Sequence, residues 1–125
     1  MKKRVSTAKA PAAIGPYSQG VCLGNTVYTS GQLGINMKTG ELGADIEEQA
    51  RCSLENIRSI LAEAGFGMTD IIKTVVFITD ISAFSKVNAI YSEFINGEIL
   101  PARSCVEVSH LPKGALVEIE AIAVK

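Results

Sequence analysis

The spacing of apolar residues changes at Asp45, and this change limits the fold more than any other feature of the sequence. From there onward apolar side chains recur every three or four positions, at Ile46, Ala50, Leu54, Ile57, Leu61 and Ala64. Such spacing predicts an amphipathic helix. Asp45 with Glu48 three residues later resembles a capping box, and Gly65 supplies a stop signal, so both ends of the helix are marked.

Strand patterns precede this helix. The segments YSQGVCL and TVYTSGQ flank Gly24-Asn25, a pair that can adopt positive φ. This arrangement predicts a hairpin in which Val21 lies opposite Tyr28.

Two neighbouring segments lack a clear period. Residues 1–16 hold two of the four prolines and are expected to form an extended lead-in. Residues 31–44 contain four glycines and are expected to form a loop with a short strand and a turn at Lys38-Thr39-Gly40.

A second unit of strand and helix follows. Residues 71–79 are rich in β-branched residues and apolar on both faces, which predicts a strand covered on both sides. Ser82 is placed to cap a helix that continues as far as Gly97, with apolar residues at Phe84, Val87, Tyr91 and Phe94. The segments RSCVEVS and LVEIEAIAVK then predict two more strands, joined by the loop HLPKGA.

These elements predict one α+β domain spanning residues 1–125, in which a mixed sheet packs its apolar face on two helices. The chain has no tryptophan and only 6% aromatic residues, so its own core is small. Burial between subunits is therefore expected.

The charges are nearly balanced, with twelve Lys and Arg against thirteen Asp and Glu, and the formal net charge is -1. This balance gives no basic field that would attract nucleic acid or an anionic membrane. No segment approaches the roughly 20 apolar residues needed to cross a bilayer. We therefore expect neither a membrane nor a nucleic acid as a partner.

The single histidine, His110, and three widely spaced cysteines argue against two classes of site. Metal centres and nucleophile–histidine pairs usually draw on several histidines or on clustered cysteines. The odd number of cysteines, and the lack of a signal-peptide core after MKKR, favour a reduced, cytoplasmic protein. His110 itself is expected at the surface.

The last two predicted strands carry polar side chains at alternating positions. The residues concerned are Arg103, Cys105 and Glu107 in the first strand, and Glu118 and Glu120 in the second. If the two strands form a hairpin about Pro112-Lys113, all five side chains share one face. The alternative interpretation, a ladder of ion pairs on a solvated face, is the commoner arrangement for such a pattern.

A shared face of this kind would combine groups suited to a small carboxylate. The planar fork of an arginine matches both oxygens of a carboxylate, so Arg103 could clamp such a substrate. A partly buried glutamate on the same face could accept a proton from water.

Other features have both a functional and a structural interpretation. Tyr17 could place a phenol in a pocket or pack with a wet hydroxyl. The run Thr29-Ser30-Gly31-Gln32 could present a backbone N–H group to an anion or form a strand bend. Asn88 could contact a ligand or link its helix to a loop. Arg103 could lower the pKa of the Cys105 thiol, although without a paired histidine a nucleophilic thiol is the less favoured interpretation.

Four strings of the sequence resemble the RidA family, also called the YjgF or reactive intermediate deaminase family: APAAIGPYSQG, TSGQ, DIIKTVVFITD and PARSCVEVSHLPKGALVEIEAIAV. The resemblance extends over essentially the whole chain, and its carboxyl-terminal block is highly specific. It implies a chorismate-mutase-like α+β fold assembled as a homotrimer, with active sites in the clefts between subunits.

The resemblance also implies an activity that needs no cofactor. Enzymes of the family hydrolyse 2-iminobutanoate and 2-iminopropanoate, products of pyridoxal-phosphate-dependent dehydratases with a link to isoleucine biosynthesis, to 2-oxo acids and ammonia. By this resemblance Arg103 binds the substrate carboxylate, Glu118 positions water and the backbone of Cys105 helps to hold the ligand. The remaining pocket positions are Tyr17, Ser30, Gly31 and Asn88.

Other functions remain open for a chain of this kind. The same arginine could hold a 2-oxo acid without catalysis, and family members have been described as ribonucleases, inhibitors of translation and holdases. The near-neutral charge and the lack of clustered basic and aromatic residues disfavour the ribonuclease. Ammonia release from freshly generated iminobutanoate would separate a catalyst from a binder.

Overall fold

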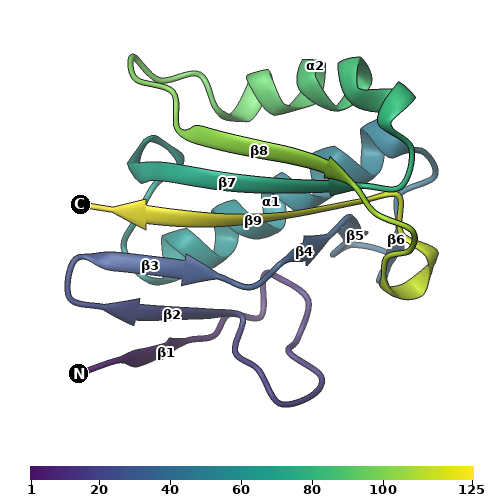
Figure 1. Cartoon of the computed structure of the whole chain (residues 1–125). Coiled ribbons are helices and arrows are strands. Elements are labelled where there is room, and N and C mark those ends of the chain that lie inside the picture. The colour runs from purple at the N-terminus through teal and green to yellow at the C-terminus, as the bar shows by residue number, and fades with distance from the viewer.

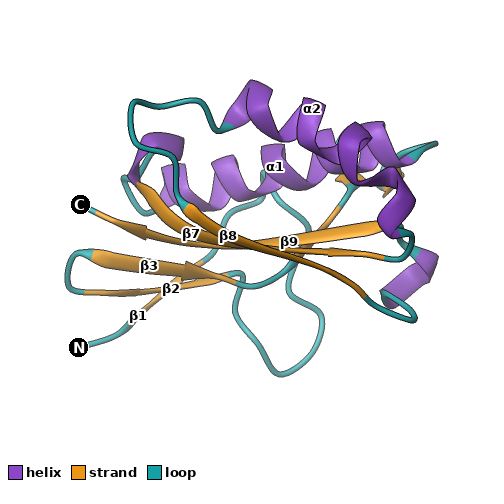
Figure 2. Cartoon of the chain, turned by 45° about the horizontal axis from the view of Figure 1, so that its top comes forward, coloured by secondary structure: helices purple, strands orange, loops and turns teal.

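The computed structural model describes residues 1–125 as a mixed β-sheet with both α-helices on the same face (Figures 1 and 2). The main sheet has seven strands in the order β1-β2-β3-β9-β7-β8, with β4 also paired to β9. Its strands are β1 (Lys3–Val5), β2 (Gly20–Leu23), β3 (Thr26–Thr29), β4 (Gln32–Leu33), β7 (Ile71–Ile78), β8 (Ala102–Glu107) and β9 (Val117–Val124). The predicted α+β class, with a mixed sheet on two helices, is confirmed.

The remaining elements connect and cover this sheet. They are the hairpin of β5 (Ile35–Asn36) and β6 (Glu41–Leu42), the helices α1 (Ile46–Glu63) and α2 (Phe84–Phe94), and three short 3-10 turns at Met68–Asp70, Ile81–Ala83 and Pro112–Gly114. Only β7 and β8 run parallel, because α2 carries the chain back between them. All other strand pairs are antiparallel.

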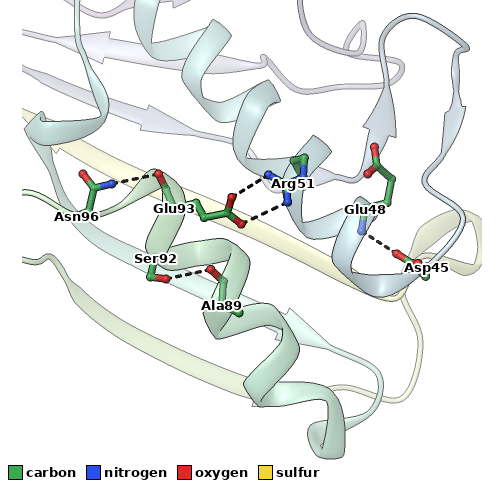
Figure 3. Close-up of polar contacts among 7 residues, drawn as sticks. All are labelled: Asp45, Glu48, Arg51, Ala89, Ser92, Glu93 and Asn96. Atoms are coloured by element: carbon green, nitrogen blue, oxygen red, sulfur yellow. Dashed lines mark hydrogen bonds and ion pairs between the residues drawn. The ribbon is translucent and has the colours of Figure 1, made fainter.

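Helix α1 begins and ends where the sequence predicts. The backbone N–H group of Glu48 donates to Oδ1 of Asp45 at 2.8 Å, which satisfies one of the unpaired donors of the first turn (Figure 3). At the other end Gly65 has a φ of +82°, a left-handed conformation that glycine adopts without strain.

Helix α2 begins differently from the prediction. Ser82 does not cap it, because the carboxylate of Asp80 accepts both the backbone N–H group and the hydroxyl of Ser82, at 2.9 and 2.6 Å. This contact starts a 3-10 turn over Ile81–Ala83, and α2 follows from Phe84.

The amino-terminal hairpin has the predicted register. Val21 pairs with Tyr28, and Gly24 in the turn has a φ of +59°. The lead-in contributes more than extended chain, since Lys3–Val5 pair with β2 as an edge strand.

Residues 31–44 contain three short strands where the sequence predicts one. The turn after Asn36 is present, with Gly40 at a φ of +76°. Helix α1 holds this segment, because Nδ2 of Asn56 donates to the carbonyl oxygens of Leu33 and Ile35 at 3.2 and 3.0 Å. A side chain from a distant helix thus satisfies backbone groups that the local sequence leaves open.

The core lies between the sheet and the two helices. Most of its fully buried side chains come from α1, β7 and β9, and include Leu54, Ile57, Leu61, Val76, Ile78, Val117 and Ile119, with Val27 of β3 and Val87 of α2 beside them. Burial alternates along β9, so residues 117, 119, 121 and 123 face the helices. The alternation predicted for this strand is confirmed.

The outer surfaces of the helices are polar. Arg51 of α1 forms an ion pair with Glu93 of α2 at 3.3 Å, and Asn96 and Ser92 donate to carbonyl oxygens three residues earlier (Figure 3). Exposed pairs of this kind contribute little to stability. The outer side of the two helices is therefore a polar surface that faces solvent.

The other face of the sheet has no helix over it (Figure 2). The prediction that both faces of residues 71–79 are covered is wrong for a single chain, because α1 and α2 pack on the same side. Ile72 is 52% exposed and Val106 of β8 is 43% exposed, while Val75 and Phe77 are only partly buried. We call this surface the open face.

The predicted hairpin of the last two strands is also wrong. Strand β7 lies between β8 and β9, as Figure 1 shows. Two features explain the outcome. The segment 108–116 is too long for a tight turn, and β8, exposed at several positions, suits the edge of the sheet while the alternating β9 suits its centre.

This topology separates the five polar side chains that the hairpin would have brought together. Arg103 is in register with Thr74, and Cys105 with Val76, so both face the helix side. Glu118 is in register with Phe77 and lies on the open face with Glu120.

Candidate active site

The candidate residues form two groups on opposite sides of the sheet. The first, which we call the glutamate half, consists of Tyr17, Ser30, Gly31 and Glu118. The second, which we call the arginine half, consists of Asn88, Arg103 and Cys105. Within one chain the structure assembles each half but does not join them.

The glutamate half is built where two strands end against β9. Strand β3 ends at Thr29 and β4 begins at Gln32, and both pair with β9, so Ser30 and Gly31 form a bend between them. Thr29 fixes the bend because its hydroxyl accepts the N–H group of Ala121 at 3.0 Å.

Glycine is required at residue 31 because Glu118 lies against it. A β-carbon at that position would be 2.6 Å from Oε2 and 2.7 Å from Cδ of Glu118, far inside van der Waals contact. The structural interpretation of this segment, a strand bend, is therefore present, and the bend lies beside the Glu118 carboxylate.

A buried glutamine holds the wall of this half. Nε2 of Gln19 donates to the carbonyl oxygens of Thr7, Ala10 and Pro11 at 3.0, 3.3 and 2.8 Å, and its Oε1 accepts the N–H group of Thr7 at 2.6 Å. The backbone oxygen of Gln19 also accepts the N–H group of Ser30 at 2.8 Å. Gln19 therefore ties the lead-in to the bend.

These elements enclose a pocket of about 740 Å³. Its polar lining residues include Ser30, Gln32 and Glu118, and most of the remaining wall is apolar: Pro11, Ala12, Ile14, Tyr17, Leu33, Ile35, Met37 and Pro112. Tyr17 lines this pocket and is 52% exposed. Lys113, the only residue other than glycine with a positive φ, also lines it.

The pocket changes the acidity of Glu118. Burial raises the pKa of its carboxyl group above the ordinary value, and the neighbouring charge of Glu120 raises it further. A carboxylate with a raised pKa holds a proton more readily near neutral pH, which is what a group that accepts a proton from water needs.

The arginine half is built on β8 and α2. Nη1 of Arg103 donates to Oδ1 of Asn88 at 2.7 Å, and the guanidinium carbon lies 4.8 Å from the ring centre of Tyr91 and 5.3 Å from that of Phe84. Asn88 thus links its helix to a strand, and in doing so orients the arginine.

Arg103 has no carboxylate partner. The ion pairs of the chain are Arg51 with Glu93 and Arg58 with Glu55. The charge of Arg103 is therefore free for an anionic ligand, and it lines a shallow cleft with Ile81, Phe84 and Cys105 at the edge of the sheet.

The Cys105 thiol is not activated. Burial raises its pKa above the ordinary value, and the opposing effect of the Arg103 charge is smaller. The lowering by Arg103 expected from the sequence is present but is outweighed, and this leaves the thiol protonated at neutral pH.

The other polar residues of the predicted face have structural surroundings. Oε1 of Glu107 accepts the backbone N–H group of Ile81 at 2.8 Å, which attaches β8 to the turn before α2. His110 is exposed in the connection after β8, as predicted. No three His, Cys, Asp or Glu side chains gather in a way that could hold a metal ion.

Sequence reasoning missed three residues that shape the site: Gln19, Phe84 and Tyr91. Phe84 and Tyr91 carry the helical spacing of core residues, and nothing in that spacing shows that their rings also meet Arg103. For Gln19 the only signal was a polar side chain at a position that the hairpin buries.

The chain has close relatives among known proteins. The family model described as Endoribonuclease L-PSP matches residues 7–125. The 2-iminobutanoate/2-iminopropanoate deaminase of Escherichia coli (strain K12) is 54% identical over 127 aligned positions, which cover 100% of this chain and 99% of the relative.

Solved structures agree with this match. The crystal structure of Escherichia coli TdcF with bound serine superposes with a TM-score of 0.94 at 50% identity, covering 98% of each chain. RidA from an Antarctic Psychrobacter superposes with a TM-score of 0.94 at 45% identity, covering 98% of this chain and 99% of that one. No helix of the structure has the length and apolar character of a membrane span. By sequence and by fold, the chain belongs to the RidA family, whose family model carries the description Endoribonuclease L-PSP.

Proposed function

We propose that the protein hydrolyses reactive 2-imino acids, such as 2-iminobutanoate and 2-iminopropanoate, to 2-oxo acids and ammonia. The observation that carries this proposal is the unpaired guanidinium of Arg103, held by Asn88 and two aromatic rings at an open cleft. The name of the Escherichia coli relative at 54% identity supports the same reaction. Serine in the TdcF structure supports a small carboxylate as ligand, since serine carries one.

A complete site requires two copies of the chain. Arg103 faces the helix side at the edge strand β8, whereas Glu118 lies on the open face. The open face exposes Ile72, Tyr28 and Val106, and a second copy would bury them. We therefore place the site between the arginine half of one copy and the glutamate half of the next, in the homotrimer that the family resemblance implies.

The reaction needs little beyond orientation and one proton acceptor. Arg103 binds the substrate carboxylate through its planar fork. The iminium carbon attracts water, and Glu118 orients that water and takes its proton as the C–O bond forms. The carbon then carries a hydroxyl and an amino group.

The second half of the reaction returns the proton. Glu118 protonates the nitrogen, and the C–N bond breaks with its electron pair leaving on ammonia. The hydroxyl then passes its proton to the departing ammonia, which leaves as ammonium, and becomes the carbonyl of the 2-oxo acid. Backbone groups near Gly31 and Cys105 would hold the oxygen atoms or the imine nitrogen. A positioned acid–base group of this kind contributes about 10²–10⁴-fold to the rate.

The proposal includes a cytoplasmic location, which the three free cysteines support because free thiols suit a reducing compartment. Neither the charge balance nor the site favours ribonuclease chemistry.

The deciding experiment measures ammonia release from 2-iminobutanoate generated in the assay, with and without the protein. The proposal expects release well above the rate in buffer. A protein that binds 2-oxobutanoate but leaves the release rate unchanged would be a binder and not a catalyst.

A further inference from the structure

Behind Arg103 lies a buried hydrogen bond that the reaction itself does not use. Oγ1 of Thr74 on β7 and the phenol oxygen of Tyr91 on α2 are 2.7 Å apart, and both residues are buried. The other residues of β7 that face the helices are apolar, namely Ile71, Val76 and Ile78. A polar pair at this one position therefore calls for an explanation, because apolar side chains would fill the same space.

The pair lies directly beside the arginine. Thr74 is the register partner of Arg103 on the neighbouring strand. The ring of Tyr91 lies 4.8 Å from the guanidinium carbon. Attraction between a cation and an aromatic ring is significant at this distance, and more so where water is partly excluded.

One helix supplies the hydrogen bond and both aromatic contacts of the guanidinium. Phe84, Asn88 and Tyr91 all belong to α2 and lie on its side toward β8. Asn88 uses one of the five N–H groups of the arginine, so the others remain available for a ligand. The hydroxyl of Tyr91 is turned away to Thr74, which leaves only its ring for Arg103.

We propose that Tyr91 is a positioning residue, which holds the Arg103 side chain in one orientation for a carboxylate, and that the bond to Thr74 fixes the ring for this task. The inference rests on the proposed function, in which Arg103 binds the substrate carboxylate. Tyr91 does not touch the substrate. A pre-oriented arginine binds more tightly because less side-chain freedom is lost on binding.

The first experiment compares Tyr91→Leu, which removes the ring, with Tyr91→Phe and Thr74→Val, which remove only the hydrogen bond. We expect Tyr91→Leu to raise both the KM for 2-iminobutanoate and the Kd for 2-oxobutanoate about tenfold. The kcat should stay within about twofold, and the pH profile should not move, because the reacting groups are untouched. Tyr91→Phe and Thr74→Val should each raise KM and Kd by only about twofold, because the ring remains but loses the bond that fixes it. Wild-type values in both variants would show that the bond to Thr74 has no part in positioning.

The same helix offers a matched control. Phe94 is also buried in α2, and its ring lies 4.8 Å from the guanidinium carbon of Arg58, away from the site. Phe94→Leu removes a comparable ring and a comparable arginine contact. It should lower stability much as Tyr91→Leu does, yet leave KM and Kd unchanged.

The second experiment does not depend on the reaction. In wild-type protein with ¹⁵N-labelled arginine, we expect resolved guanidinium N–H signals for Arg103, assigned by their loss in Arg103→Lys. In Tyr91→Leu these signals should merge, because the side chain rotates more freely.

The outcomes separate the two proposals. If the wild-type protein neither hydrolyses the imine nor binds 2-oxobutanoate, the proposed function fails while the arginine signals still report on Tyr91. If folded Tyr91→Leu retains the wild-type arginine signals, or retains the wild-type KM and Kd, the positioning role is overturned. A loss of kcat at constant KM would overturn it as well.

Discussion

The carboxylate of Glu118 lies so close to the backbone of Gly31 that a β-carbon at residue 31 would be 2.6 Å from its Oε2. The two residues are distant in sequence and meet because β3 and β4 both pair with β9, which leaves Gly31 in the bend between them. A side chain at residue 31 would occupy the space of this carboxylate, so glycine leaves room for the group that the proposed chemistry uses as proton acceptor.

Gly31→Ala should displace that carboxylate. The methyl group and Oε2 cannot occupy their present positions, so Glu118 must rotate or the bend must open, at a cost of about 1–3 kcal/mol in the free energy of unfolding. We expect kcat for imine hydrolysis to fall by about tenfold or more, as for other losses of orientation. Gly97→Ala is the control, since its new methyl group would meet only Thr69 at an ordinary 3.7 Å. Equal kcat values for the two variants would contradict the role of the close approach.

The pH dependence of the reaction should follow Glu118. Burial and Glu120 raise the pKa of its carboxyl group, so the proton-accepting form should be lost on acidification at a higher pH than for an ordinary glutamate, whose pKa is about 4.3. The acid limb of kcat/KM should therefore lie above that value. Glu120→Gln removes the like charge and should move the limb to lower pH. A limb that stays in place in Glu120→Gln and persists in Glu118→Gln would assign the titration to another group.

The fork of Arg103 should matter more than its charge. Arg103→Lys keeps a cation but loses the paired donors and the flat surface that meets Tyr91 and Phe84. We expect the Kd for 2-oxobutanoate to rise by about thirtyfold or more in this variant and in Arg103→Ala. Calorimetric titration measures this, with Arg51→Lys on the outer helix surface as control. Wild-type affinity in Arg103→Ala would exclude the carboxylate clamp.

Gln19 should control the wall of the pocket. Gln19→Ala removes four hydrogen bonds and leaves the backbone of Thr7 and Pro11 without its partner. Each lost bond of this kind typically costs about 1 kcal/mol. Amide hydrogen exchange should speed up in residues 7–12 before it does in α1, and the KM should rise. Asn96→Ala, which loses a single surface bond to Glu93, serves as the comparison. Unchanged exchange in residues 7–12 would mean that other contacts hold the wall.

Elements with local signals were predictable from the sequence. Asp45, Glu48 and Gly65 mark the ends of α1 within one helix, and Gly24 marks the hairpin between β2 and β3. In each case the contact that sets the boundary joins residues that are close in the chain, so the local sequence is enough to predict where the element begins or ends.

The pairing of β8 and β9 was not predictable in the same way. Whether β7 inserts between them depends on the path of α2 and on which strand suits the edge, and both are properties of the whole sheet. Because that pairing was wrong, so was the single polar face. Arg103 and Glu118 were identified from residue types and from the family resemblance, but the sequence did not show that one chain keeps them apart.

The contacts of Arg103 with two aromatic rings were also not predictable from the sequence, because they join a strand to a helix. Phe84 and Tyr91 have the spacing of core residues. Tyr91 is buried in the core and Phe84 packs against it, and the rings of both also meet Arg103. The spacing of apolar residues shows which face of a helix is buried. It does not show that a charged side chain of a neighbouring strand contacts that face.

The most direct test of the account asks whether Arg103 and Glu118 act from different copies of the chain. Arg103→Ala and Glu118→Gln, each nearly inactive alone, are co-expressed with different affinity tags, and oligomers that contain both are isolated by two purification steps. In these oligomers the arginine half of a Glu118→Gln chain can meet the glutamate half of an Arg103→Ala chain, and every trimer that contains both chains then has one intact site, about one in three. We predict ammonia release from 2-iminobutanoate at about a third of the wild-type rate per chain. Activity no higher than that of the two parent variants would contradict a site shared between copies.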